Sequence, residues 1–232
     1  MRIGVLGTGV VGRTLAGRLD ELDHDVVVGT RDPRETLGRS APPTGGESFA
    51  SWAEAHPSVR LQTLPEAGGH AELLVNATAG AGSVAALDAA GAGVRPGRVV
   101  VDVANALDFS TSPLPTLSVA NSDSLAEQIQ RSFPAASVVK TLNTMNAAVM
   151  TDPSRVPGQH VVFVAGDDAD AKQTVTRLLH EFGWPPDAVL DLGGILAARG
   201  AEMYLPLWLQ LMGALGTADF NIAVSQAVSR AG

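Results

Sequence analysis

A glycine-rich loop directly after the first apolar segment constrains the fold more than any other feature. Residues 1–6 form a short apolar run typical of a buried parallel strand, and the next six are Gly7, Thr8, Gly9, Val10, Val11 and Gly12. In such a GxGxxG loop, Gly7 permits a tight turn, Gly9 lets a pyrophosphate approach the backbone, and Gly12 lets the next helix pack closely. Apolar residues at helical spacing over 14–22 predict that helix, whose N-terminal amides would face phosphates. The loop therefore predicts a dinucleotide site.

The end of the second predicted strand indicates which dinucleotide binds. Residues 25–29 complete a βαβ unit, and Thr30 and Arg31 follow where NAD-binding proteins carry an acidic residue. A hydroxyl and a guanidinium suit a 2′-phosphate, which a carboxylate would repel. Because charge-assisted hydrogen bonds contribute about 1.5 to 3 kcal/mol each, we expect NADP. Asp32, one residue later, leaves NAD as the alternative.

Alternating strand-like and helix-like segments predict an α/β fold, a Rossmann-like doubly wound and mostly parallel sheet extended by extra strands. Apolar runs predict eight strands, at 1–6, 25–29, 59–64, 72–75, 98–103, 137–142, 160–165 and 188–192. Helical patterns lie between them, at 14–22, 48–55, 65–69, 84–90, 123–133 and 169–182. The stretch from 32 to the helix at 48–55 is expected to be irregular and rich in proline and glycine.

No linker or low-complexity segment divides the chain, so a single NADP-binding domain over 1–232 is expected. Within it, 1–142 would form the dinucleotide-binding core and 143–232 an extension that lines the acceptor cleft. Residues 195–216 are apolar nearly all round, which predicts an apolar C-terminal helix that is either buried or a subunit interface. We favour the interface, and hence a homodimer.

Composition limits the classes of function. The chain has 232 residues and 45% apolar content, enough for a large core. A formal net charge of -8 argues against nucleic acid and anionic membranes as partners, and the longest apolar segment, 204–215, is too short to span a bilayer. The absence of cysteine excludes disulfides, thiolate metal sites and cysteine nucleophiles. We therefore expect a cytoplasmic protein with a small-molecule partner.

Small polar residues follow several predicted strands. In an open parallel sheet, ligands bind beyond the carboxyl ends of the strands. The candidates there for binding the cofactor are Asn76, Ala77, Thr78 and Asn105. After the sixth predicted strand, the candidates for lining the acceptor cleft are Asn143, Thr144 and Met145.

The ionisable residues suggest no catalytic acid, base or metal ligand. The five histidines are expected away from the carboxyl edge of the sheet: His24, His56, His70, His160 and His180. No spacing of histidine and acidic residues suggests a metal site. Ser83 lacks a GxSxG elbow and is expected to cap a helix. Lys140 and Asn143 lie on a strand, unlike the lysine and asparagine that share a helix face in hydroxyacid dehydrogenases.

This lack of an acid or base is informative about the reaction. An enzyme that reduces a carbonyl needs a proton donor, whereas hydride transfer between two redox cofactors needs mainly proximity and stacking. A site of glycines, amides and apolar walls therefore favours the second reaction.

Three segments resemble the coenzyme F420-dependent NADP oxidoreductases, namely 1–9, 28–32 and 138–144. Residues 191–194, followed by Ala198, Arg199 and Glu202, are similar to the last strand and helix of that group. The cytosolic domains of transmembrane ferric reductases share this scheme. The resemblance implies that NADPH lies along the glycine loop, with Thr30 and Arg31 at its 2′-phosphate. It also implies a deazaflavin in a cleft walled by Asn143–Met145 and the C-terminal helix. The chain departs from the family in having Asn143 where a histidine is frequent, and in residues 217–221.

We therefore expect an NADPH-dependent enzyme that transfers hydride between NADP(H) and coenzyme F420 or a related flavin, FAD or FMN. Two alternatives remain open at this point. One is an NADPH-binding redox sensor without catalysis. The other is a reductase of a small organic carbonyl or imine, in which Asn143, Thr144 or Tyr204 would have to place a proton.

Overall fold

The computed structural model describes residues 1–41, 46–93, 95–110 and 114–227. It contains an eight-stranded sheet in the order β10-β9-β8-β5-β4-β1-β2-β3. The strands are β1 (Arg2–Leu6), β2 (Asp25–Thr30), β3 (Arg60–Thr63), β4 (Leu73–Asn76), β5 (Val99–Asp102), β8 (Ser137–Thr141), β9 (Val162–Ala165) and β10 (Val189–Asp191). Each overlaps a predicted strand, so the predicted Rossmann-like fold with a mostly parallel sheet is confirmed.

The direction of the strands changes once across the sheet. From β3 to β8 all neighbours are parallel, and the order reverses at β1 and β4, which is the doubly wound pattern. Strand β9 then runs antiparallel to β8, with Thr141 opposite Val164, and β10 runs parallel to β9. The start of β9 therefore lies at the edge where β8 ends.

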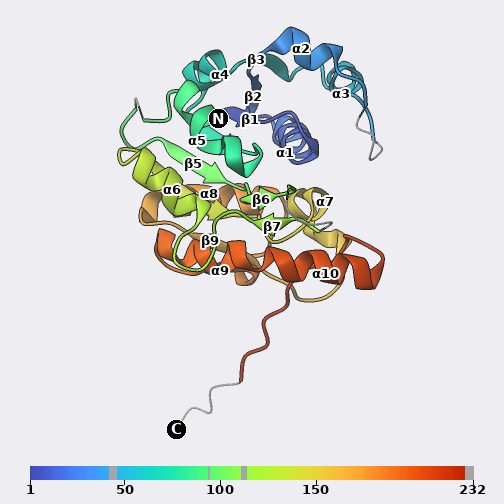
Figure 1. Cartoon of the computed structure of the whole chain (residues 1–232), viewed down its shortest axis with the longest axis vertical. Coiled ribbons are helices and arrows are strands. Elements are labelled where there is room, and N and C mark those ends of the chain that lie inside the picture. The colour runs from blue at the N-terminus through green and yellow to red at the C-terminus, as the bar shows by residue number, and fades with distance from the viewer. Residues whose placement is uncertain (42–45, 94, 111–113, 228–232) are drawn as a thin grey trace.

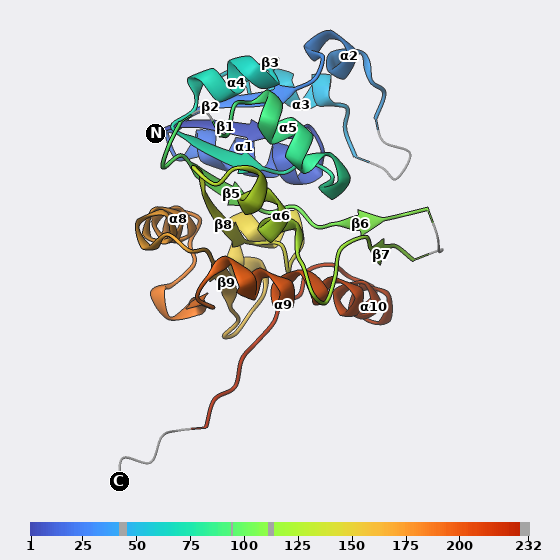
Figure 2. The ribbon, with the colours of Figure 1, turned by 60° about the vertical axis from the view of Figure 1, so that its left-hand side comes forward.

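Helices cover both faces of the sheet (Figures 1 and 2). They are α1 (Val10–Glu21), α2 (Pro33–Gly38), α3 (Phe49–Ala55), α4 (Leu64–His70), α5 (Ser83–Ala89), α6 (Leu125–Ser132), α7 (Ala147–Thr151), α8 (Ala169–Glu181), α9 (Ala198–Met203) and α10 (Leu205–Leu215). Side chains alternate between the faces of a strand. Ile3 and Val5 of β1 join a core cluster with α1, α3, α7 and α8, whereas Leu6 joins a second cluster with α4, α5 and α6.

Several short elements escaped prediction. Helix α2 begins at Pro33 because the Asp32 carboxylate accepts hydrogen bonds from the next turn, where an irregular stretch was expected. Helix α7 and the hairpin of β6 (Leu107–Asp108) and β7 (Thr116–Leu117) were also missed. Ser83 does not cap α5: it is the first helical residue, buried, with Gly82 at the cap position. The proline- and glycine-rich residues 42–45 lie outside the described ranges.

The C-terminal helix is exposed rather than buried. Of α10, only Leu205 is buried, and Leu207 and Leu215 are 55% and 56% exposed. The chain then returns along α7 and β9, where Asp219 accepts a hydrogen bond of 2.8 Å from Asn146 and the Ile222 carbonyl accepts one of 2.9 Å from the Val161 amide. Beyond these contacts the chain extends away from α9 and α10 (Figure 2), and Val224 and Gln226 border a cavity. No described helix is long and apolar enough to cross a membrane.

Candidate active site

The glycine loop between β1 and α1 is shaped by three different constraints. Gly7 has φ +122°, and a Cβ there would lie 2.4 Å from the Ala77 carbonyl oxygen. A Cβ on Gly12 would lie 2.1 Å from the Gly7 carbonyl oxygen. A Cβ on Gly9, by contrast, would meet no atom within 4 Å, and Gly9 is exposed at the start of α1. Protein packing therefore requires Gly7 and Gly12, whereas Gly9 leaves open space beside the first turn of a helix, where a phosphate group fits.

The end of β2 places a free cation near this loop. Arg31 is exposed, and within the described residues its side chain makes neither an ion pair nor a hydrogen bond. Thr30 is only 8% exposed, and its hydroxyl lies 2.8 Å from that of Thr36. Because the Thr36 hydroxyl donates to the Asp32 carbonyl, Thr30 must donate to Thr36. The Thr30 hydroxyl is therefore occupied within the turn, and Arg31 is the better candidate for a phosphate.

A second arginine in the same turn was missed in the sequence. Arg34 lies in the first turn of α2, exposed, and no described carboxylate pairs with its guanidinium. Asp32, which kept NAD open as an alternative, uses Oδ1 to cap α2 through the amides of Arg34 and Glu35. The signal was the sequence Asp-Pro-Arg, because proline after a capping residue starts a helix. The turn therefore has two unpaired arginine side chains.

The amide side chains at the other strand ends already have hydrogen-bond partners within the chain. Asn76 at the end of β4 is fully buried; it donates to Asp102 at 2.8 Å and accepts from the Thr78 hydroxyl at 2.7 Å. Asn105 donates to the Asn143 carbonyl at 2.9 Å, and Asn143 donates to Asn105 at 3.0 Å. The structure thus pairs Asn76 with Thr78 and Asn105 with Asn143, and most of the polar atoms of these side chains are already hydrogen-bonded.

The predicted acceptor residues after β8 are also buried. Asn143, Thr144 and Met145 are 2%, 2% and 5% exposed, and Asn143 donates to the Ala201 carbonyl of α9 at 3.1 Å. The preceding residue, Leu142, has φ +60°, a conformation that a leucine adopts only when its surroundings impose it. The segment after β8 is thus buried and hydrogen-bonded to α9.

One histidine lies nearer the ligand edge than expected. His160 precedes β9, and because β9 is antiparallel to β8, His160 lies on the edge where β8 ends. Its Nε2 lies 3.0 Å from the Pro153 carbonyl oxygen and its Nδ1 2.9 Å from Asn221 Nδ2, so both nitrogens have structural partners. The expectation that all five histidines lie away from this edge was wrong for His160, since it assumed a parallel strand.

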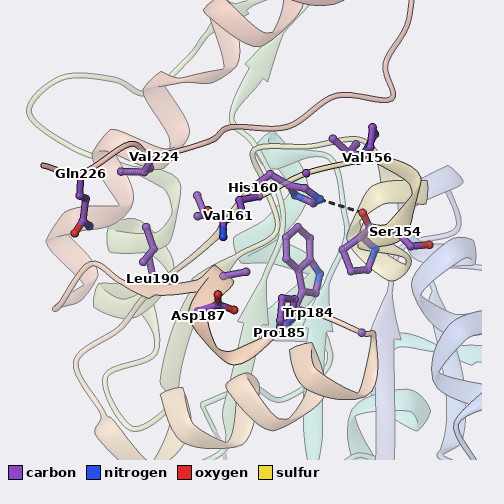
Figure 3. A pocket seen from close by; sticks show the side chains of 16 residues that line it. Ser154, Val156, His160, Val161, Trp184, Pro185, Asp187, Leu190, Val224 and Gln226 are labelled. Atoms are coloured by element: carbon purple, nitrogen blue, oxygen red, sulfur yellow. Dashed lines mark hydrogen bonds between the residues drawn. The ribbon is translucent and has the colours of Figure 1, made fainter. Parts of the chain in front are cut away.

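His160 borders a cavity of about 680 Å³ (Figure 3). Trp184 packs edge-on against the His160 ring, with centroids 5.2 Å apart. Residues near 153–161 and 183–190 line it, together with Val224 and Gln226. None of the predicted site residues lines this cavity. In the described part of the chain, no group of histidine and acidic side chains could hold a metal ion.

Comparisons with known proteins agree with this geometry. Residues 2–106 match the family model described as NADP oxidoreductase, coenzyme F420-dependent. A candidate F420-dependent NADP reductase from Arthrobacter sp. FB24 is 55% identical, with 97% of this chain and 100% of that chain covered and a TM-score of 0.92. The likeness thus extends over 97% of this chain, including most of the part after residue 106.

Two further proteins are more distant. The metalloreductase STEAP3 of Rattus norvegicus is 29% identical over 211 residues, which cover 89% of this chain but only 38% of the rat protein. A reductive aminase from Aspergillus terreus, solved with NADPH4, cyclohexanone and allyl amine, is 17% identical with a TM-score of 0.61, over 93% of this chain and 62% of that chain. The second likeness concerns the fold alone.

Proposed function

Because the chain belongs to the coenzyme F420-dependent NADP oxidoreductases, and is thus an NADP-dependent oxidoreductase, we propose that it transfers hydride between NADP(H) and coenzyme F420 or a related flavin. The observation that carries the proposal is the 55% identity, over essentially the full length of both chains, to the candidate F420-dependent NADP reductase. The lack of an unpaired acid or base among the described strand-end residues fits the same reaction.

The residues present fit the phosphates of NADP. Gly9 leaves room for a pyrophosphate at the first turn of α1, and Gly7, Thr8, Val10, Val11 and Gly12 complete that loop. Arg31 is free to bind a 2′-phosphate, and Arg34 would be the second cation. A guanidinium in this position tolerates the ribose hydroxyl of NAD. It forms charge-assisted hydrogen bonds with the 2′-phosphate of NADP, and therefore favours NADP over NAD.

At the other end of the dinucleotide, the chain supplies orientation. Bound NADPH supplies the hydride from its nicotinamide ring. Ala77 and Thr78, which follow Asn76, would bound the face of the cleft next to the glycine loop, and Asn105 and Asn143 would fix the wall beside α9. Because these amides are already paired, their positions need not change when ligands bind, which favours a fixed distance between donor and acceptor. The proton that accompanies the hydride would come from solvent.

A second candidate acceptor has its own support. The 29% identity to a metalloreductase favours a metal chelate, reduced directly or through a flavin. Anaerobic stopped-flow absorbance with NADPH and, in parallel, F420, FAD, FMN and a ferric chelate separates these acceptors. We expect bleaching of F420. Reduction of the flavins or the chelate alone would favour the second candidate.

The same experiment tests the two remaining alternatives. NADPH binding with no acceptor reduced would contradict the proposed reaction and favour the redox sensor or a small carbonyl or imine substrate. For the last of these, Tyr204 is a weak proton donor, because burial raises the pKa of its hydroxyl.

We also propose that the chain forms a homodimer through α10. This helix carries no charged residue, and its exposed leucines form an apolar surface of the kind that marks protein contacts. Leu207→Glu is expected to convert the dimer to a monomer in sedimentation velocity. Leu37→Glu, at a leucine on α2 that is 46% exposed, is the matched control and should leave the dimer intact. A wild-type monomer would contradict the proposal.

A further inference from the structure

A group of three charged side chains is buried beneath the strand ends. Lys140 of β8 lies 2.9 Å from the Asp102 carboxylate of β5 and 3.0 Å from the Glu202 carboxylate of α9. Its third donor bonds the Ala104 carbonyl. The three charged side chains are at most 2% exposed. Burial opposes the charge on Lys140, but the two carboxylates outweigh it and raise the pKa of the ammonium. We call these three residues the ion cluster.

One arm of the ion cluster leads to the glycine loop. Asp102 accepts from Asn76 Nδ2 at 2.8 Å and from the Ala104 amide at 3.2 Å. Asn76 in turn accepts from Thr78. The Ala77 carbonyl between them is the atom that excludes a side chain at Gly7. Only the Asn76 side chain therefore separates the Asp102 carboxylate from Thr78, which the proposed function places beside the nicotinamide end of the dinucleotide.

The other arm leads to the wall of the acceptor cleft. Glu202 accepts from the Leu125 and Ala126 amides at the start of α6, at 2.8 and 3.1 Å. Its neighbour Ala201 accepts from Asn143. The ion cluster thus lies between the two groups of residues that would bound the reacting rings. Because the side chains of the ion cluster are at most 2% exposed, they cannot contact a substrate directly. The ion cluster can therefore influence the reaction only electrostatically or through neighbouring residues.

The charges of the ion cluster do not cancel. Two carboxylates and one ammonium leave one net negative charge, in a region from which water is excluded and where electrostatic interactions are strong. The nicotinamide ring is cationic in NADP⁺ and neutral in NADPH. We propose that the ion cluster sets the preference of the site between the two, by stabilising the oxidised ring more than the reduced ring.

This inference rests on the proposed placement of the nicotinamide at the ends of β4, β5 and β8. It makes Asp102, Lys140 and Glu202 positioning residues with an electrostatic role. A negative charge that favours NADP⁺ lowers the reduction potential of the bound couple, so the bound cofactor donates hydride more readily. The sign of this effect distinguishes it from a role in folding, which would alter both affinities together.

The test measures the dissociation constants of NADP⁺ and NADPH on the purified full-length protein and takes their ratio. Glu202→Gln removes the net negative charge, and we expect the ratio of the NADP⁺ constant to the NADPH constant to rise about three- to tenfold. Asp102→Asn removes the same charge from a different strand and should raise the ratio in the same direction. Two variants on separate elements keep the test decisive if one of them fails to fold.

A charge-conserving variant separates charge from structure. Glu202→Asp retains the carboxylate but shortens the side chain that contacts Lys140 and the α6 amides. We expect its ratio to lie within about twofold of the wild type, because the net charge is unchanged. Glu127→Gln is the control outside the ion cluster: Glu127 also lies at the start of α6, but it pairs with Arg199.

The outcomes distinguish this inference from the proposed function. Unchanged ratios in Glu202→Gln and Asp102→Asn, or a Glu202→Asp variant shifted as far as Glu202→Gln, would overturn the electrostatic role while leaving NADPH binding and turnover in place. A wild-type protein that binds NADP(H) but reduces no acceptor would overturn the proposed acceptor, and the ratio would still report on the ion cluster.

Discussion

At the glycine-loop end of the candidate site, Gly9 is exposed beside open space and Arg31 has no partner among the described residues. At the strand-end side, Asn76 and Asn143 are buried, and their side chains are bound to other residues of the chain. The glycine-loop end therefore has open space and a cation without a partner among the described residues, whereas the side chains at the strand ends are hydrogen-bonded within the chain. If NADP(H) binds as proposed, this contrast predicts that affinity comes from the phosphate end and orientation from the nicotinamide end.

The largest expected effect tests the open space at Gly9. Gly9→Val should reduce NADPH affinity by about 100-fold or more, because the side chain occupies the path of the pyrophosphate. Since the backbone of Gly9 has φ -74° and its Cβ meets no protein atom, the melting temperature should stay within about two degrees. Titration of NADPH by fluorescence and a thermal melt measure both.

Gly69→Val is the control for this substitution, because Gly69 is also exposed and open at its Cβ. It should leave NADPH affinity unchanged. Retained affinity in Gly9→Val would show that the glycine loop is not the phosphate site.

The next effect tests whether Arg31 recognises the 2′-phosphate. Arg31→Ala should weaken NADPH by about 10- to 150-fold, which corresponds to about 1.5 to 3 kcal/mol for a lost charge-assisted bond. NADH, which lacks this phosphate, should bind as before. Arg39→Ala is the control, because Arg39 already pairs with Glu35 at 2.7 Å. Equal losses for NADPH and NADH would contradict the assignment.

The smallest effect tests the nicotinamide end. Asn143→Ala leaves Asn105 and the Ala201 carbonyl without their donor, so the free energy of unfolding should fall by about 1 to 3 kcal/mol. We expect kcat to fall about fivefold while the NADPH dissociation constant changes less than about twofold, because orientation rather than binding is lost. Urea titration and steady-state kinetics give these values.

Gln130 offers a matched control at the opposite end of β8. Its amide bonds the Phe133 and Ala136 carbonyls and accepts from Val138. Gln130→Ala should lower stability to a similar extent without changing kcat. If both variants lose stability and activity in parallel, the contrast between the two ends of the site is wrong.

The sequence predicted regular structure best where a local pattern determines it. All eight strands of the sheet overlap predicted strands, and the clearest are β2, β4 and β5, because buried parallel strands are continuous apolar runs. Helices α2 and α7 were missed because five or six residues are too few to show a period. The antiparallel direction of β9 was also not foreseen, since strand direction depends on how the chain returns to the sheet and not on the residues of the strand.

Within the site, composition was easier to predict than pairing. The sequence identified Asn105 and Asn143 as polar residues at strand ends, but they bond across 38 residues of chain, and Asn143 reaches Ala201 across 58. No local pattern reports such contacts. For the same reason Lys140 could be set aside as a catalyst from its neighbours, but its two carboxylate partners became visible only in the folded chain.

The left-handed backbone of Leu142 has a consequence for how the enzyme responds to heat. That conformation costs a leucine about 1 to 2 kcal/mol, and burial of its side chain, 3% exposed in the core with α1 and α8, offsets the cost by about 1.5 to 3 kcal/mol. Hydrophobic packing of the Leu142 side chain therefore determines the path of the chain into Asn143. Loosening of that packing would let the bend relax while the sheet persists, so turnover should decline at temperatures below global melting.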